Sequence, residues 1–245
     1  MMFSLKKNKS TRNFNTIIKS PVFRVVEAYK SLRTNILFSI PAVDGRSKRI
    51  MFTSANPNEG KSTTSANTAI TFAQQTDVRV LLIDADLRKA TAHKYFGLSA
   101  KKGLSNVLAG QDTLDNCIQR VPDMQNLYLM ASGVLPPNPA ELLAGKRMEA
   151  LFEELDKSFD IVIIDTPPVN VVADALTICN HTDGVILVAT DNKTSYNELQ
   201  AAVNQLKIAD AKILGVVLNK ARTSNYRTRQ KYSNYYRSDE ETSSN

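Results

Sequence analysis

Long apolar runs are missing from this sequence. No segment approaches the roughly 18 consecutive apolar residues of a membrane-spanning helix, so none is predicted. The first nine residues lack the apolar core of a secretory signal peptide. Cysteine is scarce as well, because only Cys117 and Cys179 occur, far apart and without metal-site spacing. Their apolar or helical surroundings predict buried free thiols in a reducing cytosol.

Acidic residues are missing from residues 1–26, which carry six Lys or Arg. Residues 220–245 carry six basic and three acidic residues, whereas the chain between these ends has 19 basic and 21 acidic residues. The net charge of +7 therefore belongs to the two ends. Basic ends favour an acidic partner, an anionic membrane surface or nucleic acid, and the plain alternative is solvated ends without a partner.

Short apolar runs alternate with helical patterns along the rest of the chain. Runs such as 80–83 and 161–164 are continuously apolar, which is typical of strands buried on both faces of a parallel sheet. The sequence therefore predicts a doubly wound α/β fold, a mostly parallel sheet flanked by helices. The predicted strands are 49–53, 78–83, 127–130, 160–164, 184–189 and 212–218. The predicted helices are 27–38, 62–74, 103–109, 139–156, 171–180 and 194–208.

The 245 residues fit one large domain with a substantial core. Residues 1–24 are basic and lack periodicity, so they are predicted to be flexible. Residues 25–220 form the predicted folded domain. Residues 221–245 are rich in Arg, Lys, Ser, Tyr and Asn, which predicts a disordered tail.

Residues 54–63 read Ser-Ala-Asn-Pro-Asn-Glu-Gly-Lys-Ser-Thr, between a predicted strand and a predicted helix. In that setting, backbone N–H groups and a helix N-terminus bind phosphate, as in a P-loop. Lys61 is expected to reach the β- and γ-phosphates, and the Ser62 hydroxyl to bind Mg²⁺. Ala55 replaces the usual first glycine and is small enough for a close approach. The alternative is an ordinary turn with a stray Gly-Lys-Ser. The predicted nucleotide-binding residues here are Asn58, Glu59, Gly60, Lys61, Ser62 and Thr63.

Carboxylates follow two of the continuously apolar runs. Asp84 follows the first run and Asp165 the second, and Asp86 comes two residues after Asp84. Asp165 is predicted to hold Mg²⁺ directly or through water. Of Asp84 and Asp86, one would help to order the metal and the other would accept a proton from an attacking hydroxyl. For each Asp alone, the alternative is a helix cap or a loop acid.

Other polar residues near these ends allow two interpretations each. Asn219 ends the last predicted strand and is a candidate for hydrogen bonding a nucleotide base, with loop structure as the equal alternative. Arg88 and Lys89 follow the acidic pair and would contact phosphates or simply lie on the surface. His93 and His181 lack partners for a metal or a triad, so both are predicted to be structural or exposed.

Tyrosines crowd into eleven residues of the C-terminal segment. Phosphorylation adds roughly −1.5 to −2 charge per site, so several modified sites would reverse the charge of this basic segment. The alternative is a segment that adheres to RNA or another surface through Arg and Tyr. The predicted phosphoacceptors are Tyr226, Tyr232, Tyr235 and Tyr236.

Four segments together resemble the motifs of bacterial tyrosine kinases. They are Ala55–Thr63, Leu82–Arg88, Leu135–Leu142 and Ile163–Pro168. The chain resembles most closely the cytoplasmic kinase subunits of capsule and exopolysaccharide operons in Gram-positive bacteria, from about Glu27 to the C-terminus. This resemblance implies the fold of the partition and cell-division ATPases, with ATP and Mg²⁺ as cofactors.

The resemblance also implies roles for individual residues. Lys61 would bind phosphate, and Ser62 and Asp165 would serve Mg²⁺. Asp84 and Asp86 would belong to the second Walker motif, with Asp84 near the metal and Asp86 favoured as the base.

Partners are implied in the same way. A membrane-embedded adaptor of the polysaccharide copolymerase type would activate the kinase at the inner face of the cell membrane, and a cognate tyrosine phosphatase would reverse its action. In a ring-like oligomer, the tail of one subunit would enter the site of its neighbour. Glu27, Lys30 and Arg33 resemble the oligomer motif Glu-x-x-Arg-x-x-Arg, with Lys30 in place of the first Arg.

These features predict an ATP-dependent protein-tyrosine kinase that phosphorylates its own tail and regulates polysaccharide assembly. A second hypothesis is a positioning ATPase that acts on DNA or membrane. Such proteins usually carry a lysine early in the phosphate loop, where this chain has Ala55-Asn56-Pro57. A third hypothesis is a binding module that nucleotide switches between assembly states. No specific nucleic-acid partner is predicted.

Overall fold

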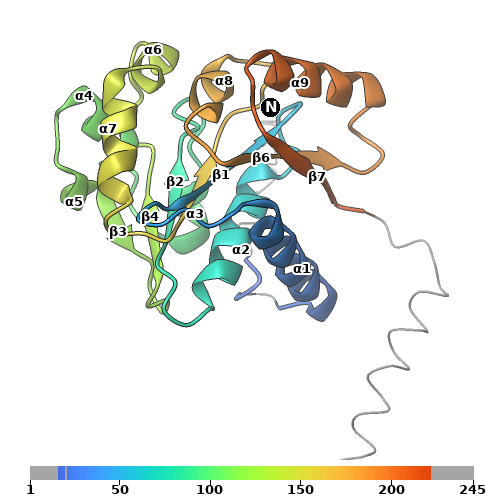
Figure 1. Ribbon diagram of the computed structural model, residues 1–245, viewed down its shortest axis with the longest axis horizontal. Coiled ribbons are helices and arrows are strands. Elements are labelled where there is room, and N and C mark those ends of the chain that lie inside the picture. The colour runs from blue at the N-terminus through green and yellow to red at the C-terminus, as the bar shows by residue number, and fades with distance from the viewer. Residues whose placement is uncertain (1–15, 20, 222–245) are drawn as a thin grey trace, which may run out of the picture.

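The computed structural model describes residues 16–19 and 21–221 of the chain. Its centre is a seven-stranded sheet in the order β3-β4-β2-β5-β1-β6-β7 (Figure 1). Neighbouring strands are parallel except β3 with β4, which confirms the predicted mostly parallel sheet. The strands are β1 (Lys48–Ser54), β2 (Val80–Asp84), β3 (Ile118–Arg120), β4 (Leu127–Met130), β5 (Ile161–Asp165), β6 (Gly184–Thr190) and β7 (Ile213–Asn219).

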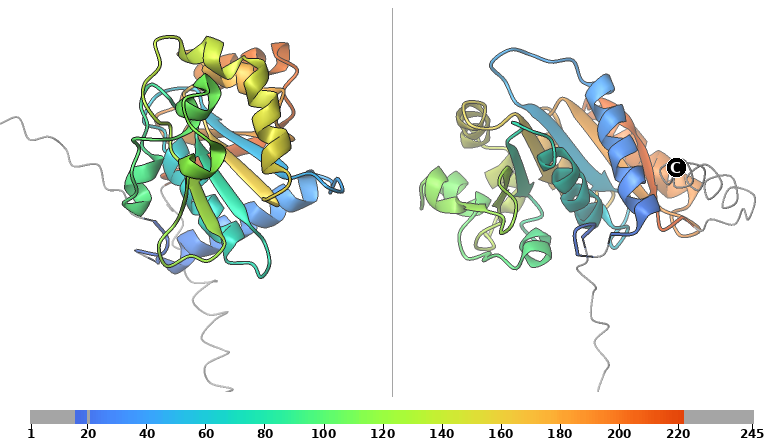
Figure 2. Two further views of the ribbon diagram at one scale, coloured as in Figure 1. Left: turned by 90° about the vertical axis from the view of Figure 1, so that its left-hand side faces the viewer. Right: turned by 90° about the horizontal axis from the view of Figure 1, so that it is seen from below.

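Helices cover both faces of the sheet. In the two views of Figure 2 and in Figure 1, α1 and α2 lie together on one face. Side chains from α1, α2 and α3 share one hydrophobic core, and those from α4, α6, α7, α8 and α9 share the other. The helices are α1 (Phe23–Ser39), α2 (Lys61–Ala73), α3 (Ala92–Phe96), α4 (Leu104–Ala109), α5 (Leu114–Cys117), α6 (Pro139–Leu143), α7 (Lys146–Leu155), α8 (Asp174–Cys179) and α9 (Tyr196–Ile208).

The central strands are buried on both faces, as their continuous apolar runs predict. On β1, Ile50 and Phe52 pack into the core beneath α1 and α2, whereas Met51 between them packs into the opposite core. All three side chains are fully buried. Because each buried side chain of this size contributes roughly 1.5–3 kcal/mol, the two cores fix the register of the strands. That register sets where each strand ends.

Several elements differ from the prediction. The strand β3 was missed, because its three residues, none of them buried, are too few to show a period. The predicted helix over 139–156 is two helices, since Gly145 between them has an extended backbone. The predicted helix over 171–180 begins only at Asp174. The short helices α3 and α5 were also missed, because one or two turns carry little periodic signal.

The folded part extends further toward the N-terminus than the boundary predicted at residue 25. The N–H of Ile17 donates to Asn67 Oδ1 at 2.9 Å, and the Ile17 side chain is buried. Lys19 Nζ donates to the carbonyl of Tyr95 at 2.7 Å. The predicted flexible start of the chain and the predicted tail with its four tyrosines lie largely or wholly outside the described residues.

Two predictions from composition can be checked directly. Cys117 and Cys179 are buried free thiols, as expected. No helix within residues 16–19 and 21–221 combines the length and the apolar character needed to cross a bilayer.

Candidate active site

The carboxyl ends of β1, β2, β5 and β7 meet at one edge of the sheet, around a cavity of about 600 Å³. The loop after β1 forms one wall, and segments after β2, β5 and β7 form the others. The sheet thus gathers polar residues that are far apart in sequence. Of the predicted nucleotide-binding residues, Asn58, Gly60, Lys61, Ser62, Thr63 and Asn219 line this cavity.

The phosphate loop needs glycine at one position for two reasons. Gly60 has a φ of +94°, in the left-handed region that residues with a Cβ rarely adopt. A Cβ at this position would also lie 2.0 Å from Asn219 Nδ2. Gly60 precedes α2, whose first residue is Lys61. The turn therefore presents the free N–H groups of the first helical turn to the cavity, which suits an anion.

Glu59 supports the loop from behind. Its carboxylate accepts hydrogen bonds from the N–H of Asn56 at 3.0 Å and from the Thr194 hydroxyl. Its carbonyl accepts from Thr190 Oγ1 at 3.1 Å and from Asn219 Nδ2 at 2.9 Å. The side chain is buried and does not line the cavity, so it braces the loop, and the contact of Glu59 with nucleotide stays a prediction.

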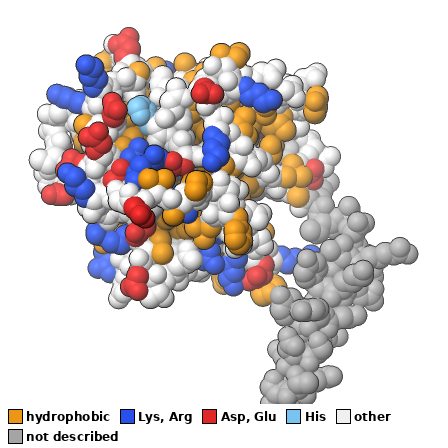
Figure 3. All heavy atoms as spheres, in the orientation of Figure 1, with side chains coloured by type: hydrophobic (Ala, Val, Ile, Leu, Met, Phe, Trp, Pro, Cys, Tyr) orange, Lys and Arg blue, Asp and Glu red, His pale blue; other side chains and the backbone are white. Residues whose placement is uncertain are grey.

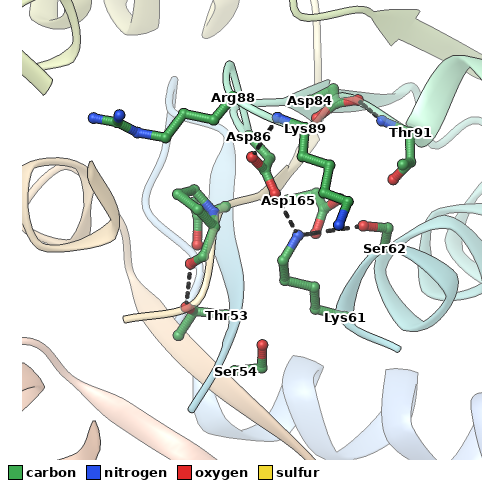
Figure 4. A network of polar contacts seen from close by, with 12 residues as sticks. Thr53, Ser54, Lys61, Ser62, Asp84, Asp86, Arg88, Lys89, Thr91 and Asp165 are labelled. Atoms are coloured by element: carbon green, nitrogen blue, oxygen red, sulfur yellow. Dashed lines mark hydrogen bonds and ion pairs between the residues drawn. The ribbon is translucent and has the colours of Figure 1, made fainter. Parts of the chain in front are cut away.

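Lys61 lies between two carboxylates in the floor of the site (Figure 4). Its Nζ is 2.9 Å from Asp86 Oδ2 and 3.7 Å from Asp165 Oδ1. Burial alone would lower the pKa of Lys61, but the charges of Asp165 and Asp86 outweigh burial and raise that pKa. The lysine therefore stays charged, as a phosphate-binding cation must.

Asp165 ends β5 and is fully buried. Neither of its carboxylate oxygens has a hydrogen-bond partner among the described residues. Burial raises its pKa, although the charge of Lys61 opposes that shift. A buried carboxylate without hydrogen bonds is costly unless a cation compensates it. The contact with Lys61 compensates it only in part, because 3.7 Å is long for an ion pair.

Asp84 ends β2 directly opposite Asp165 in the sheet register. Its Oδ2 accepts hydrogen bonds from the N–H groups of Thr91 and Ala92, both at 2.9 Å, where α3 begins. Burial, together with the charge of Asp165, raises the pKa of Asp84 to about 7. The helix-cap alternative is therefore realised for Asp84, which leaves only its Oδ1 without a partner for the predicted metal role.

Mg²⁺ fits the remaining donors. Within the described residues, no three His, Cys, Asp or Glu side chains converge on one point. Mg²⁺ rarely needs such a cluster, because it usually takes one or two carboxylates together with phosphate oxygens and waters. The Asp165 carboxylate without hydrogen-bond partners and the Ser62 hydroxyl at the start of α2 supply that smaller set.

The segment after β2 places its two basic residues differently. The guanidinium of Arg88 donates to the buried carboxylate of Asp174, with Nε to Oδ2 at 2.9 Å and Nη2 to Oδ1 at 3.1 Å. In Figure 4 the Arg88 side chain points away from Lys61, whereas Lys89 runs toward it. The N–H of Lys89 also donates to Asp86 Oδ1 at 2.9 Å. Both residues line the cavity.

Sequence reasoning missed the residues that support the site. Asp174, Thr190 and Thr194 lie 86, 131 and 135 residues from their partners in the loops. Tyr95, whose hydroxyl is 2.7 Å from Thr63 Oγ1, comes from a helix that was not predicted. No local pattern marks such residues, so only the fold reveals them.

The residues that resemble an oligomer motif lie on α1. Lys30 Nζ is 2.7 Å from Glu27 Oε1 in an exposed pair. Arg33 instead donates to the carbonyl of Thr71 at 2.7 Å, which ties α1 to α2 within the same chain. The structure thus leaves Glu27 and Lys30 at the surface and gives Arg33 an internal contact.

Comparison with known proteins agrees with this geometry. A family model described as an AAA domain matches residues 47–219. The chain is 41% identical over 225 residues to the tyrosine-protein kinase YwqD of Bacillus subtilis (strain 168), covering 91% of this chain and 93% of that protein. It is 36% identical over 214 residues to a tyrosine-protein kinase in the cps region of Klebsiella pneumoniae, covering 87% of this chain and 29% of that protein.

Solved structures show the same relationship. The chimerical protein CapA2B2 superposes with a TM-score of 0.78 at 33% identity, over 84% of this chain and 89% of that one. A ParA family ATPase from Chlorobium tepidum TLS shares the fold alone, with a TM-score of 0.59 at 22% identity over 76% of this chain and 79% of that one. The chain therefore belongs to the bacterial tyrosine-protein kinases, ATP-dependent enzymes built on a P-loop domain.

Proposed function

We propose that this kinase phosphorylates the tyrosines of its own C-terminal segment, in a neighbouring subunit, and thereby regulates polysaccharide synthesis and export. The observation that carries the proposal is that Lys61, which lines the cavity, contacts both Asp86 in the same cavity and the fully buried Asp165. One site would then hold Lys61 as the phosphate-binding cation, Asp86 as the catalytic base and Asp165 as the metal ligand. The four tyrosines at 226, 232, 235 and 236 supply the acceptors.

Each side chain has a defined task in this proposal. Bound Mg²⁺, held by Ser62 and Asp165, would neutralise charge on the transferred phosphoryl group. Lys61 would leave the Asp86 carboxylate and bind phosphate oxygens. Asp86 would then accept the proton of the tyrosine hydroxyl as the tyrosine oxygen bonds to the γ-phosphorus and ADP departs. The ion pair of Lys61 with Asp86 would hold the base inactive until nucleotide binds.

Nucleotide orientation follows from the order of the strands. β7 and Asn219 lie on one side of β1, and β5 and β2 lie on the other. We place the purine base of the nucleotide on the Asn219 side of β1, because the acidic residues lie on the other side. The Asn219 amide braces the loop through Nδ2, and its Oδ1 accepts the N–H of Lys220 at 2.8 Å. Each of these atoms keeps one further hydrogen-bonding position for a base.

An adaptor would bring the kinase to the membrane. The names of two similar proteins support this part, since one lies in a cps region and one is a chimera named CapA2B2. A tyrosine phosphatase would reset the tail. Specific nucleic-acid binding is not proposed, because Lys and Arg are interspersed with Asp and Glu on the face shown in Figure 3 and form no broad basic field there.

A mixing experiment tests the proposal. A Lys61→Met chain that keeps its tyrosines is incubated with ATP, Mg²⁺, the adaptor segment and a chain in which all four tail tyrosines are Phe. Phosphotyrosine is then mapped by mass spectrometry. We expect phosphate on the Lys61→Met chain, because its partner supplies the active site. ATP turnover without phosphotyrosine would contradict the proposal, and phosphate only on unmixed parent protein would contradict transfer between subunits.

A further inference from the structure

The cavity has an apolar wall that phosphate binding does not explain. Pro168, Val171 and Val172 follow β5 and line the cavity, and the Val171 side chain is 56% exposed. An exposed valine facing a polar site has no evident role in binding Mg²⁺ or phosphate. We call these three residues together with Arg88 the acceptor wall. The question is which part of the reactants this wall meets.

The contacts across the cavity order its walls. Asn219 lies over Gly60 at one end, and Lys61 contacts Asp86 in the middle. Arg88 then reaches Asp174, which is two residues beyond Val172. Because β5 and β2 lie on the other side of β1 from β7, the acceptor wall is on the β5–β2 side of the cavity, away from Asn219. The nucleotide would occupy the rest of the cavity, with its phosphates over the loop after β1 and its purine base beside Asn219. The acceptor wall is then the part of the cavity that remains for the group that receives the phosphoryl.

A buried charge holds Arg88 at this end. Asp174 is fully buried and makes two hydrogen bonds to a guanidinium whose side chain is 44% exposed. Burying a carboxylate is costly, and pairing with a fixed fork of donors is the compensation. The arrangement fixes the plane of Arg88 at the rim. A fixed guanidinium can stack on an aromatic ring, as valine and proline side chains also can pack against one.

We propose that the acceptor wall binds the ring of the incoming tyrosine, and that Asp174 is a positioning residue that orients Arg88 for this contact. The proposal rests on the proposed function, because it assumes a tyrosine of the tail as acceptor. The tyrosine hydroxyl would then point toward Asp86. Asp174 also cancels the charge of Arg88, so the tail, with five Lys or Arg in residues 221–245, meets less repulsion there.

Binding measurements test the wall without requiring turnover. The full chain with all four tail tyrosines changed to Phe is saturated with ADP and Mg²⁺. A fluorescent peptide with the sequence of residues 223–245 is added, and its anisotropy gives the affinity. Val171→Asp should weaken peptide binding about tenfold or more, because a ring would lie against a charge. Affinity for a fluorescent ADP analogue should stay within about twofold.

Val43→Asp is the matched control. Val43 is 53% exposed, close to the value for Val171, and lies before β1, at the opposite edge of the sheet from the cavity. This variant should bind peptide as the parent does. The proposal is overturned if Val171→Asp binds peptide normally, if it weakens ADP as much as peptide, or if the parent binds no peptide. An absence of phosphotyrosine in the mixing experiment would contradict the proposed function but would not alter these binding results.

Asp174→Asn tests the positioning role. Its side chain can no longer hold the guanidinium with two charge-assisted bonds, so peptide binding should weaken by about threefold to tenfold at unchanged ADP affinity. Arg88→Lys keeps the charge but loses the planar, two-pronged guanidinium, so it should weaken peptide binding as much as Asp174→Asn does. If Asp174→Asn lowers only the thermal midpoint and leaves peptide affinity unchanged, Asp174 merely joins α8 to the segment after β2, and its positioning role is overturned.

Discussion

The ends of β2 and β5 form an informative pair. Each strand is a run of four apolar residues that ends in an aspartate, and the two aspartates face each other in the sheet register. Both are fully buried. Asp84 caps α3 through two backbone N–H groups, whereas Asp165 has no hydrogen-bond partner among the described residues. Identical sequence patterns thus produce a supported carboxylate and an unsupported one.

The difference follows from what comes next in the chain. After β2 the chain turns back within eight residues and brings the N–H groups of Thr91 and Ala92 to Asp84. After β5 it continues as Thr166-Pro167-Pro168, and the two prolines have no N–H to donate. Asp165 therefore keeps its oxygens available next to Lys61 and Ser62. Asp84, whose carboxylate accepts two backbone N–H groups, maintains the fold, whereas Asp165, whose carboxylate accepts none, is available for a cofactor.

The largest effect is expected at Asp165. Asp165→Asn should reduce the rate of phosphotyrosine formation by about 10²–10³, because metal-assisted charge stabilisation is worth several kcal/mol. Its thermal stability without Mg²⁺ should stay equal or rise, since a buried carboxylate without hydrogen bonds is removed. Initial rates at saturating ATP and thermal unfolding measure the two. A large loss of stability without loss of rate would make Asp165 the structural member of the pair.

A smaller effect on rate and a larger one on stability are expected at Asp84. Asp84→Ala leaves two buried N–H groups without an acceptor, which should lower the free energy of unfolding by about 1–3 kcal/mol. Asp84→Asn keeps an oxygen that can accept both N–H groups, so it should stay closer to the parent. Urea unfolding measures both variants. If Asp84→Asn lost activity as completely as Asp165→Asn, the predicted metal role of Asp84 would be supported and the contrast would fail.

The pH dependence of stability tests the protonation of Asp84. Since burial and the charge of Asp165 raise the pKa of Asp84 to about 7, the folded state binds a proton that the unfolded state has already lost. Asp84 therefore stabilises the fold most below about pH 4, and its contribution falls as pH rises toward about 7. Urea unfolding of the Mg²⁺-free protein should show this decline.

Two variants identify the group responsible. Asp84→Asn should make the decline above about pH 4 less steep, and the raised pKa of the buried Asp165 accounts for the part that remains. Asp112→Asn is the control, because the contact of Asp112 with Lys102 lowers the pKa of Asp112 to about 2. Asp112 favours the folded state above about pH 4 and loses that effect only as pH falls toward its own pKa, so its removal should not change the decline. A decline as steep in Asp84→Asn as in the parent would assign it to another group.

Sequence patterns predicted those parts of the molecule that local physics determines. Apolar runs located six of the strands, and the predicted loop at 54–63 forms one wall of the cavity. Lys61 was predicted from the Gly-Lys-Ser turn of this loop, Asp165 from its place at the end of an apolar run, and Asp86 from its place two residues after Asp84. The short strand β3 and the break at Gly145 were not predicted, since they depend on tertiary pairing and on a single backbone torsion.

The support of the site could not be predicted in the same way. Glu59 carries the sequence position of a phosphate-loop residue, but its contact with Thr194 depends on where α9 begins. Arg88 could not be assigned a partner, because Asp174 comes from another strand-to-helix connection. The different uses of Asp84 and Asp165 depend on where α3 starts. A helix of five residues is too short for its first residue to be predicted from the sequence.

The smallest effect is expected at Thr91, and it tests whether Asp84 alone caps α3. Thr91 stands at the N-cap position, where a side-chain hydroxyl usually accepts a backbone N–H, but it makes no such bond. Because Asp84 accepts the N–H groups of Thr91 and Ala92 instead, Thr91→Ala should change the free energy of unfolding by less than about 0.5 kcal/mol. An ordinary Thr cap is worth about 1 kcal/mol. Urea unfolding of Thr91→Ala, Asp84→Ala and the double variant measures how much each residue contributes to the cap of α3. If Thr91→Ala lowered the free energy of unfolding by about 1 kcal/mol or more, and by less in the Asp84→Ala background, the two residues would share the cap. The Asp84 carboxylate would then be partly available for a cofactor, as the Asp165 carboxylate at the end of β5 is.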